Sequence, residues 1–499
     1  MTSRGLDQLD RRSVLLGSFA LLASGVLTGC TGHDEQQSGR RLIGPDSDEV
    51  RQTEAARRAR NQAVVTASLV AQETTIDLGA RSVATWAYGQ TVPGPLLRTR
   101  AGDLLRVKVT NDLPSATSVH WHGLALRNDM DGVPGLTQDP IPSQDSFTYE
   151  FTTPDPGTYF FHSHTGVQLD RGLHGVLVVD DPAEPGRYDE EWIVVLDDWI
   201  DGTGRTPDDV LSDLVAMSGH GSMGGMGGMV EGMRSPLLGR AGDVDYPHHL
   251  INGRTPEAPV TLTGKPGQRI RIRLVNAGSD TAFRVALGGH RMTVTHSDGF
   301  PVEPRETEAL LIGMGERYDV LVELGDGVFP LVAGAEGKAG RGLALVRTAS
   351  GDAPPADSPI PELDGRVLLG DDFTAPDAVR LDHRPLDRRL DLVLAGRMMP
   401  YRWTINGATF PNAEPLEVTQ GDRLRLRLRN RSMMFHPVHL HGHTFGLVAG
   451  GARKDTVVVR PMQTLEVDLD AGNPGQWALH CHNAYHAEAG MMTTLSYRR

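Results

Sequence analysis

Apolar and polar residues alternate in the same way in three segments of the chain. These are residues 102–111 (GDLLRVKVTN), 267–276 (GQRIRIRLVN) and 421–430 (GDRLRLRLRN), and each begins with glycine and ends with asparagine. Alternation with a period of two predicts a strand with one buried face, because successive side chains of a strand point to opposite faces. The glycine predicts a turn before each strand. We interpret the three segments as copies of one structural unit.

Other short apolar runs predict further strands at residues 175–179, 192–196 and 318–324, and no long helical periodicity stands out. Short strands separated by turn residues are typical of β-sandwiches, and a unit that recurs at about the length of a domain indicates a repeated domain. We therefore predict an all-β chain with domains at residues 62–183, 188–350 and 385–499. Residues 351–384 begin with a proline-rich stretch and are predicted to form a linker.

The first thirty residues have the pattern of an export signal. Arg11 and Arg12 precede an uncharged run at residues 13–28, and the sequence LTGC then ends at Cys30. A basic segment, an apolar run and small residues at a cleavage point are typical of a secretory signal. The paired arginines resemble a twin-arginine signal and LTGC resembles a bacterial lipobox, so we expect lipidation of Cys30. The alternative is an apolar N-terminus that merely frays. Residues 31–61 are polar and are predicted to form a tether.

Composition narrows the class of protein. The 499 residues carry a net charge of −14, which disfavours non-specific binding to nucleic acid. The chain has two cysteines, so lipidation of Cys30 would leave Cys481 as a lone thiol that cannot form an internal disulfide. A lone thiol in an oxidising compartment would be protected if it bound a metal.

Histidines gather in four clusters, which lie only in the predicted outer domains. The clusters hold ten of the 19 histidines, namely His120 and His122; His162 and His164; His436, His439 and His441; and His480, His482 and His486. PGTYFFHSH at residues 156–164 matches PGQWALHCH at residues 474–482, and VHWHG at residues 119–123 matches VHLHG at residues 438–442. Imidazoles with one thiolate and a thioether, without paired cysteines or carboxylates, suit copper better than zinc.

The segment HCHNAYHAEAGM at residues 480–491 explains why one cysteine lies between two histidines. On a strand, Cys481 faces one side and His480 and His482 face the other. One metal can therefore take the thiolate while a separate cluster takes the imidazoles. A cysteine with two histidines and a distant methionine describes a blue-copper site, to which His436 can add the second imidazole. The remaining eight histidines form four H-x-H pairs, which can hold three more copper ions between the outer domains. Four coppers match the four electrons that convert O2 to water.

Together, the four histidine motifs resemble those of the multicopper oxidases of three-domain laccase type, and the resemblance covers nearly everything after about residue 62. It implies three consecutive cupredoxin-like Greek-key β-sandwich domains, O2 as electron acceptor and four copper ions. The implied type 1 copper has the ligands His436, Cys481, His486 and axial Met491. The implied type 2 copper has His120 and His439. The implied type 3 pair has His122, His162 and His482 on one side and His164, His441 and His480 on the other.

The resemblance also suggests a source of protons for water formation. Asp131, in the sequence HGLALRNDMDG, stands where similar enzymes have a carboxylate near the copper cluster. The alternative is an aspartate that only forms the turn before Gly132. The family often has an acid directly after the type 1 histidine, where this chain has Ala487 followed by Glu488.

Methionines indicate the reducing substrate. Residues 217–233 (MSGHGSMGGMGGMVEGM) are a glycine-rich insert with five methionines, namely Met217, Met223, Met226, Met229 and Met233. Thioethers bind the soft ion Cu(I), although a flexible insert would have the same glycine content. Met434 stands where cuprous oxidases of the family use a methionine, but Ser432 replaces the carboxylate expected beside it.

We therefore expect a monomeric, lipid-anchored cuprous oxidase in bacterial copper detoxification. It would be exported by the twin-arginine route and held on the outer face of the cytoplasmic membrane, in the periplasm or in the cell envelope. The chain resembles the lipoprotein-type multicopper oxidases of actinobacteria. Phenols, aromatic amines and Fe(II) are also expected to react at a surface-accessible type 1 edge. The alternatives are a laccase that acts mainly on organic phenols, and a non-catalytic copper-binding or storage protein.

Overall fold

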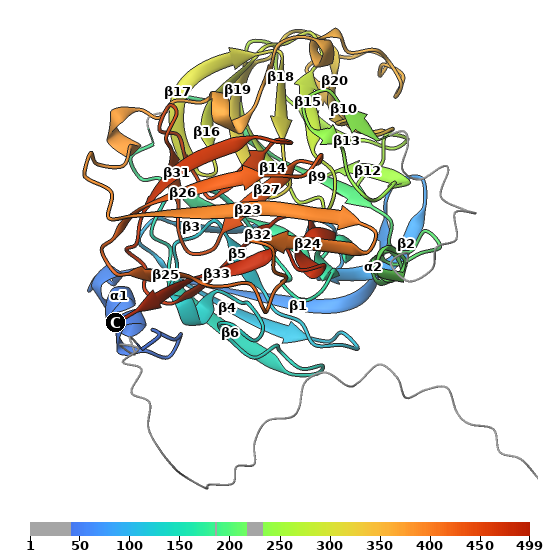
Figure 1. The fold of residues 1–499 in the computed structure, drawn as a ribbon. Coiled ribbons are helices and arrows are strands. Elements are labelled where there is room, and N and C mark those ends of the chain that lie inside the picture. Colours follow the sequence, from blue (N-terminus) through green and yellow to red (C-terminus); the bar gives the residue numbers. More distant parts are fainter. Residues whose placement is uncertain (1–40, 185–186, 217–232) are drawn as a thin grey trace, which may run out of the picture. The chain divides into compact units, whose positions relative to one another are not determined.

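The computed structural model describes residues 41–184, 187–216 and 233–499, and residues 41–499 form one compact unit. The predicted export signal, Cys30 and the first four methionines of the insert lie outside the described residues. Within the described ranges, no helix combines the length and the apolar character that a membrane crossing needs. The prediction of an all-β fold is confirmed, because strands make up each of the domains (Figure 1).

The first domain is a sandwich of two sheets, with strand orders β2-β1-β4-β6 and β3-β8-β7-β5. Its strands are β1 (Val64–Asp77), β2 (Ser82–Tyr88), β3 (Leu97–Arg100), β4 (Leu104–Asn111), β5 (His120–His122), β6 (Ser146–Thr152), β7 (Gly157–His162) and β8 (His174–Asp180). Short 3-10 helices lie at Asn128–Met130 and Gln168–Arg171. A separate apolar core fills this sandwich, with Trp121, Tyr149 and Phe161 fully buried at its centre.

The middle domain has larger sheets, with strand orders β12-β9-β14-β19-β16-β17 and β13-β21-β20-β15-β18-β22. Its strands are β9 (Glu190–Trp199), β10 (Arg234–Ser235), β11 (Gly239–Arg240), β12 (His248–Ile251), β13 (Val260–Thr263), β14 (Arg269–Asn276), β15 (Phe283–Leu287), β16 (Met292–Ser297), β17 (Phe300–Thr307), β18 (Ala309–Ile312), β19 (Arg317–Glu323), β20 (Val328–Ala335), β21 (Arg341–Arg347) and β22 (Val367–Leu368). Helix α2 (Pro207–Ala216) precedes the methionine-rich insert.

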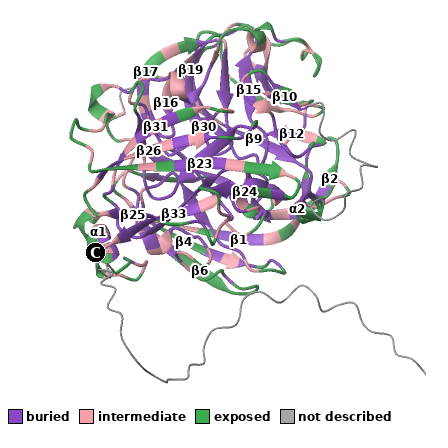
Figure 2. Ribbon diagram, viewed as in Figure 1, coloured by how far each residue is buried: buried purple, intermediate pink, exposed green. Residues whose placement is uncertain are grey.

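The third domain has the strand orders β24-β23-β26-β31-β28-β29 and β25-β33-β32-β27-β30. Its strands are β23 (Arg388–Met398), β24 (Tyr401–Ile405), β25 (Leu416–Thr419), β26 (Arg423–Asn430), β27 (His436–Leu440), β28 (Phe445–Leu447), β29 (Arg453–Lys454), β30 (Thr456–Val459), β31 (Thr464–Asp470), β32 (Gln476–Cys481) and β33 (Met492–Arg498), and helix α3 covers Ala484–Glu488. One apolar core runs through the middle and third domains, and Figure 2 shows their inner strands as buried.

The repeated unit occupies the same place in each domain. Strands β4, β14 and β26 each pair in parallel with the first strand of their domain and antiparallel with a later strand, β6, β19 or β31. The asparagine that ends each unit is buried and pins the following loop. Asn430, for example, accepts from the backbone N–H of Ser432 and donates to the carbonyls of Met434 and Val459, and Asn111 and Asn276 bond in the same way. Buried backbone groups need such partners, which explains the asparagine.

Residues 41–61, predicted as part of a tether, instead pack on the fold. Ile43 and Val50 are buried, and the Ile43 N–H donates to the carbonyl of Tyr497. Helix α1 (Asp48–Arg57) is capped by Ser47, whose side chain accepts from the N–H of Val50. The tether prediction was wrong here because a polar helix needs only a few buried contacts to be held in place.

The segment 351–384 is also packed rather than free. Strand β22 pairs in parallel with β18 of the middle domain, and Leu368, Leu369 and Phe373 are buried. Short 3-10 helices lie at Pro361–Asp364, Gly370–Asp372 and Asp377–Val379. A few apolar residues follow the proline-rich start of the segment, and they attach this connection to the middle domain.

Candidate metal centres

Strand β32 separates the thiol of Cys481 from the imidazoles beside it, as the alternation of side chains predicts. Cys481 lies with His436 and His486, whereas His480 lies with His164 and His441, and His482 lies with His122 and His162; a further group joins His120, His122 and His439. Within each group, the candidate ligand atoms lie within 4.8 Å of one another. All ten histidines of the predicted clusters therefore fall into groups that suit a metal ion.

The thiol site is compact and fully buried. The sulfur of Cys481 lies 3.6 Å from Nδ1 of His436 and 3.5 Å from Nδ1 of His486, and these two nitrogens are 3.2 Å apart. Burial raises the pKa of the Cys481 thiol, so a cation is needed to hold it as a thiolate. Met491 is buried beside this site, where its backbone bonds to that of Cys481 and His486.

Both imidazoles of the thiol site are oriented through their outer nitrogens. Nε2 of His436 lies 2.8 Å from the hydroxyl of Ser432, and Nε2 of His486 lies 3.0 Å from a carboxylate oxygen of Asp243. An acceptor at Nε2 leaves the lone pair on Nδ1, which faces the sulfur. Asp243 comes from the middle domain, and sequence reasoning missed it because no motif links it to a histidine 243 positions further along the chain.

The remaining eight histidines meet between the first and third domains. Most of them are anchored by one nitrogen to a backbone carbonyl or a carboxylate. Four histidines donate from Nδ1–H to a backbone carbonyl: His120 to Asp131, His162 to Ser163, His439 to Asp455 and His480 to Cys481. Two others bond a carboxylate oxygen: His441 that of Asp131 and His122 that of Asp455. Anchoring in this way fixes which nitrogen keeps a lone pair for a metal.

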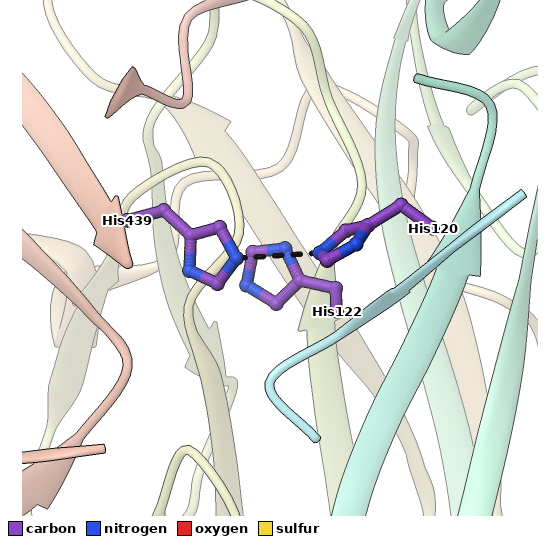
Figure 3. Close-up of side chains that lie close together, drawn as sticks. All are labelled: His120, His122 and His439. Atoms are coloured by element: carbon purple, nitrogen blue, oxygen red, sulfur yellow. Dashed lines mark hydrogen bonds between the residues drawn. The ribbon is translucent and has the colours of Figure 1, made fainter. Parts of the chain in front are cut away.

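Among the described residues, several nitrogens on the inner side of this cluster lack a hydrogen-bond partner. In the described part of the chain, buried nitrogens without a hydrogen bond include Nδ1 of His122, Nε2 of His162, Nε2 of His164 and both ring nitrogens of His482. Nε2 of His439 lies 3.4 Å from Nε2 of His120, and Figure 3 shows the two rings converging beside His122. Buried polar atoms are normally paired, so this set of orphaned imidazole nitrogens fits metal ions.

Burial keeps these imidazoles neutral, which metal binding requires. It lowers the pKa of His122, His162, His164, His441 and His482 well below the ordinary value, and it lowers the pKa of His480 to about 3. A neutral imidazole offers a lone pair at physiological pH without first releasing a proton. Neutral nitrogen donors without cysteine pairs suit copper, in agreement with the interpretation of the sequence.

Two buried carboxylates support the cluster. Asp131, predicted as a proton source, has one oxygen 2.9 Å from Nδ1 of His441 and the other 3.2 Å from Nδ1 of His120. Asp455, which sequence reasoning missed, lies 3.1 Å from Nε2 of His122. Burial alone would raise the pKa of Asp455, but the guanidinium of Arg317 and the contact with His439 hold it below the ordinary value. Asp455 is therefore a buried anion beside the cluster.

A small cavity lies between the cluster and helix α3. It has a volume of about 40 Å³ and is lined by His162, His164 and His480 together with the exposed residue Glu488. A space of this size accommodates about one water molecule or a similarly small molecule. Glu488 therefore lies near the cluster, although it stands one position beyond the place where the family often has an acid.

The predicted surface-accessible edge of the thiol site is wrong for the described part of the protein. His436 and His486 are both 0% exposed. The ring of Trp403, on strand β24, lies 3.9 Å from that of His486, and Met434 is buried next to the site. The β23–β24 hairpin lies more than thirty positions before His436, so the pattern around the ligands gave no sign of this cover.

Of the predicted substrate methionines, the structure describes Met434 and Met233. Both are buried, whereas the neighbouring Met433 is 71% exposed. The segment that follows Met233 returns to this region, since the N–H of Arg240 donates to the carbonyl of Met433. The C-terminal end of the methionine-rich insert therefore lies close to the chain that carries His436.

Comparisons with known proteins agree with this geometry. Models of multicopper oxidase domains match residues 70–184, 230–350 and 383–499. The chain is 51% identical to multicopper oxidase MmcO of Mycobacterium tuberculosis, with 89% of each chain covered. It is 28% identical to a copper resistance protein A homolog of Pseudomonas syringae pv. tomato, with 84% of this chain and 90% of the relative covered. The laccase of Botrytis aclada matches with a TM-score of 0.69 at 25% identity, with 91% and 90% covered.

Proposed function

Since the chain belongs to the multicopper oxidase family, we propose that it couples the oxidation of Cu(I) to the four-electron reduction of O2 to water. His436, Cys481, His486 and Met491 would hold the type 1 copper, and His120 and His439 would hold the type 2 copper. We assign the type 3 pair to the groups His122, His162, His482 and His164, His441, His480. The observation that carries the assignment is the separation of thiol and imidazoles by strand β32.

Bound copper would supply one-electron redox chemistry at the thiolate and reduction of O2 at the histidine cluster. The chain supplies the connection, because peptide bonds join Cys481, the last residue of β32, directly to His480 and His482. The small cavity beside His162 and Glu488 gives O2 and water a route to the cluster. Asp131 holds two of the imidazoles and is the proposed proton source for water formation.

Cu(I) as the reducing substrate is supported by the cover over the thiol site. The outer nitrogen of His486 is already bonded to Asp243, and both imidazoles are fully buried, so a phenol ring cannot contact them directly. Thioethers bind the soft ion Cu(I), and Met433 and Met434 stand three and two positions before His436. The copper resistance proteins among its relatives support a role in copper detoxification.

A laccase acting mainly on phenols and a copper-storage protein are the competing functions. Steady-state O2 uptake by one copper-loaded preparation, measured with Cu(I), Fe(II) and a phenol, separates them. We expect Cu(I) to have the highest kcat/KM. A preference for the phenol would favour the laccase, and no uptake with Cu(I) would leave only storage.

Replacing Met217, Met223, Met226 and Met229 by serine is expected to lower kcat/KM for Cu(I) by about tenfold, roughly the effect of losing one favourable ligand contact. The reason is that serine keeps the length of the insert but removes the soft thioethers. Phenol oxidation by the same variant serves as the control and should change less than twofold. Equal losses with both substrates would contradict a role in copper capture.

Asp243→Asn is expected to lower Cu(I) oxidation by about 10–100-fold, the usual effect of changing a group that orients a metal ligand. Asparagine removes the negative charge of the carboxylate, which accepts hydrogen bonds from His486 and from the hydroxyl of Tyr401. The reduction potential of the thiolate-bound copper should therefore rise. Asp197→Asn is the matched control, because Asp197 forms a similar buried pair with His174. An unchanged potential in Asp243→Asn would disprove the orienting role.

Export and anchoring complete the proposal. We propose that residues 1–30 direct export by the twin-arginine route and that lipidated Cys30 anchors a monomer outside the bacterial cytoplasmic membrane. Cys30→Ala should move the protein from the membrane fraction to the soluble fraction without changing its copper spectra. A soluble wild-type protein would argue against the lipid anchor.

A further inference from the structure

The middle domain reaches the histidine cluster although it has no H-x-H motif. Among the described residues, the candidate metal groups contain no member from this domain. We propose that Arg317 and Gly315 of the middle domain are positioning residues that fix the cluster histidines of the other two domains. The inference rests on copper binding to that cluster, as proposed above, but not on Cu(I) being the substrate.

Arg317 forms a two-pronged contact with Asp455 of the third domain. It is the first residue of β19 and is fully buried. Its Nη1 donates to one carboxylate oxygen over 2.7 Å and its Nη2 to the other over 2.6 Å. Its Nε also donates to the carbonyl of Thr158 in the first domain. A planar guanidinium that uses both prongs fixes the orientation of the carboxylate, which a lysine cannot do.

Asp455, which Arg317 orients, in turn orients two histidines. One of its carboxylate oxygens lies 3.1 Å from Nε2 of His122 in the first domain, and its backbone carbonyl lies 3.0 Å from Nδ1 of His439 in the third. The hydroxyl of Thr456 lies 3.0 Å from each of the same two nitrogens. The two imidazoles are stacked with centroids 3.7 Å apart. Arg317 therefore acts at a junction where all three domains meet.

Residues of the middle domain also bond to Asp455 and to its two neighbours in the chain. Asp298 accepts from the backbone N–H of both Asp455 and Thr456, each over 3.2 Å. The ammonium of Lys454 lies 3.2 Å from the carboxylates of Asp298 and Glu316. These buried contacts hold the start of strand β30, so Asp455 has little freedom to follow a displaced histidine.

Gly315 packs against two of the cluster histidines, His122 and His482. Its φ is +82°, and a Cβ there would lie 2.9 Å from atoms of both His122 and His482. Gly123, after the first H-x-H motif, is equally restricted, since a Cβ would lie 2.3 Å from Nη2 of Arg317 and 2.6 Å from Asp455. Backbone of the middle domain therefore packs directly on the imidazoles, and only glycine leaves room for it.

The test compares copper-loaded Arg317→Lys with wild type by electron paramagnetic resonance, absorption spectroscopy and copper content. We expect the type 2 resonance to change and the near-ultraviolet band of the type 3 pair to weaken. Copper affinity of the cluster should fall by about 10–100-fold, the usual effect of losing a group that orients a ligand. The blue absorption of the thiolate site should stay unchanged, because Arg317 does not contact it. Asp455→Asn, which keeps the shape of the side chain, should give the same changes.

Arg273→Lys is the matched control. Arg273 is also buried in the middle domain, bonds Asp319 and Thr158, and contacts none of the cluster histidines. It should lower the melting temperature without altering the spectra. Cluster signals in Arg317→Lys and Asp455→Asn that match wild type would overturn the inference, even if both variants are less stable. If Arg317→Lys does not fold, Asp455→Asn decides. Wild-type protein that shows the blue band but no type 2 resonance would instead refute the ligand assignment.

Discussion

Cys481→Ser is expected to abolish the blue absorption and to reduce O2-coupled oxidation of every substrate by at least about 10³-fold, a barrier increase of roughly 4 kcal/mol. The only thiol in the described part of the chain lies within 3.6 Å of both imidazoles of its site. A serine hydroxyl stays protonated where a thiol can become a thiolate, and it is not a soft ligand. Absorption and O2 uptake of copper-loaded protein measure the two effects.

The histidine cluster provides the internal control for this variant. Cys481 faces away from it, so the type 2 resonance and the copper content of the cluster should remain. The backbone bond from Cys481 to Met491 and the carbonyl that anchors His480 are unchanged by the substitution. Substantial turnover by a correctly folded Cys481→Ser protein would show that electrons reach O2 without the thiolate. Loss of cluster copper as well would show that the two sites are not independent.

The sequence predicted those parts of the site that depend on local periodicity. The period of two around Cys481 predicts that the thiol and the neighbouring imidazoles face opposite ways, and the same rule predicts that each H-x-H pair shares a face. Likewise, strands β4, β14 and β26 end at the asparagines that end the repeated segments. The strand pattern is local, so it can be recognised in the sequence without knowledge of the tertiary structure.

Partners of the histidines could not be predicted, because they come from distant parts of the chain. Asp243 precedes His486 by 243 positions, and Asp455 follows His122 by 333. Arg317 and Asp455 are 138 positions apart and belong to different domains. A buried aspartate has no characteristic spacing from the imidazole that it orients. Domain packing brings these groups together, and this packing also places Trp403 over a thiol site that was expected to be accessible.

Asp131 is expected to show separable roles in anchoring and in proton supply. Its carboxylate and carbonyl contact His120 and His441, so it links histidines of the first and third domains. The loop around it is tightly fixed, since Gly132 has a φ of +81° and a Cβ there would lie 1.8 Å from the carbonyl oxygen of Val119. Asp131→Ala removes both acceptor and acid, and should lower copper binding and turnover together.

Asp131→Asn should keep the copper but lose turnover. The amide oxygen can still accept from Nδ1 of His441, so copper content and the type 2 resonance should remain near wild type. The amide cannot deliver a proton, so O2 turnover should fall by about 10²-fold, the lower end of what a positioned acid contributes. The loss should grow as pH rises, because the protons must then come from an increasingly basic solvent. Turnover of Asp131→Asn within twofold of wild type at all pH values, with Asp131→Ala inactive, would assign anchoring alone to Asp131 and shift the search for the acid to Glu488 beside the cavity.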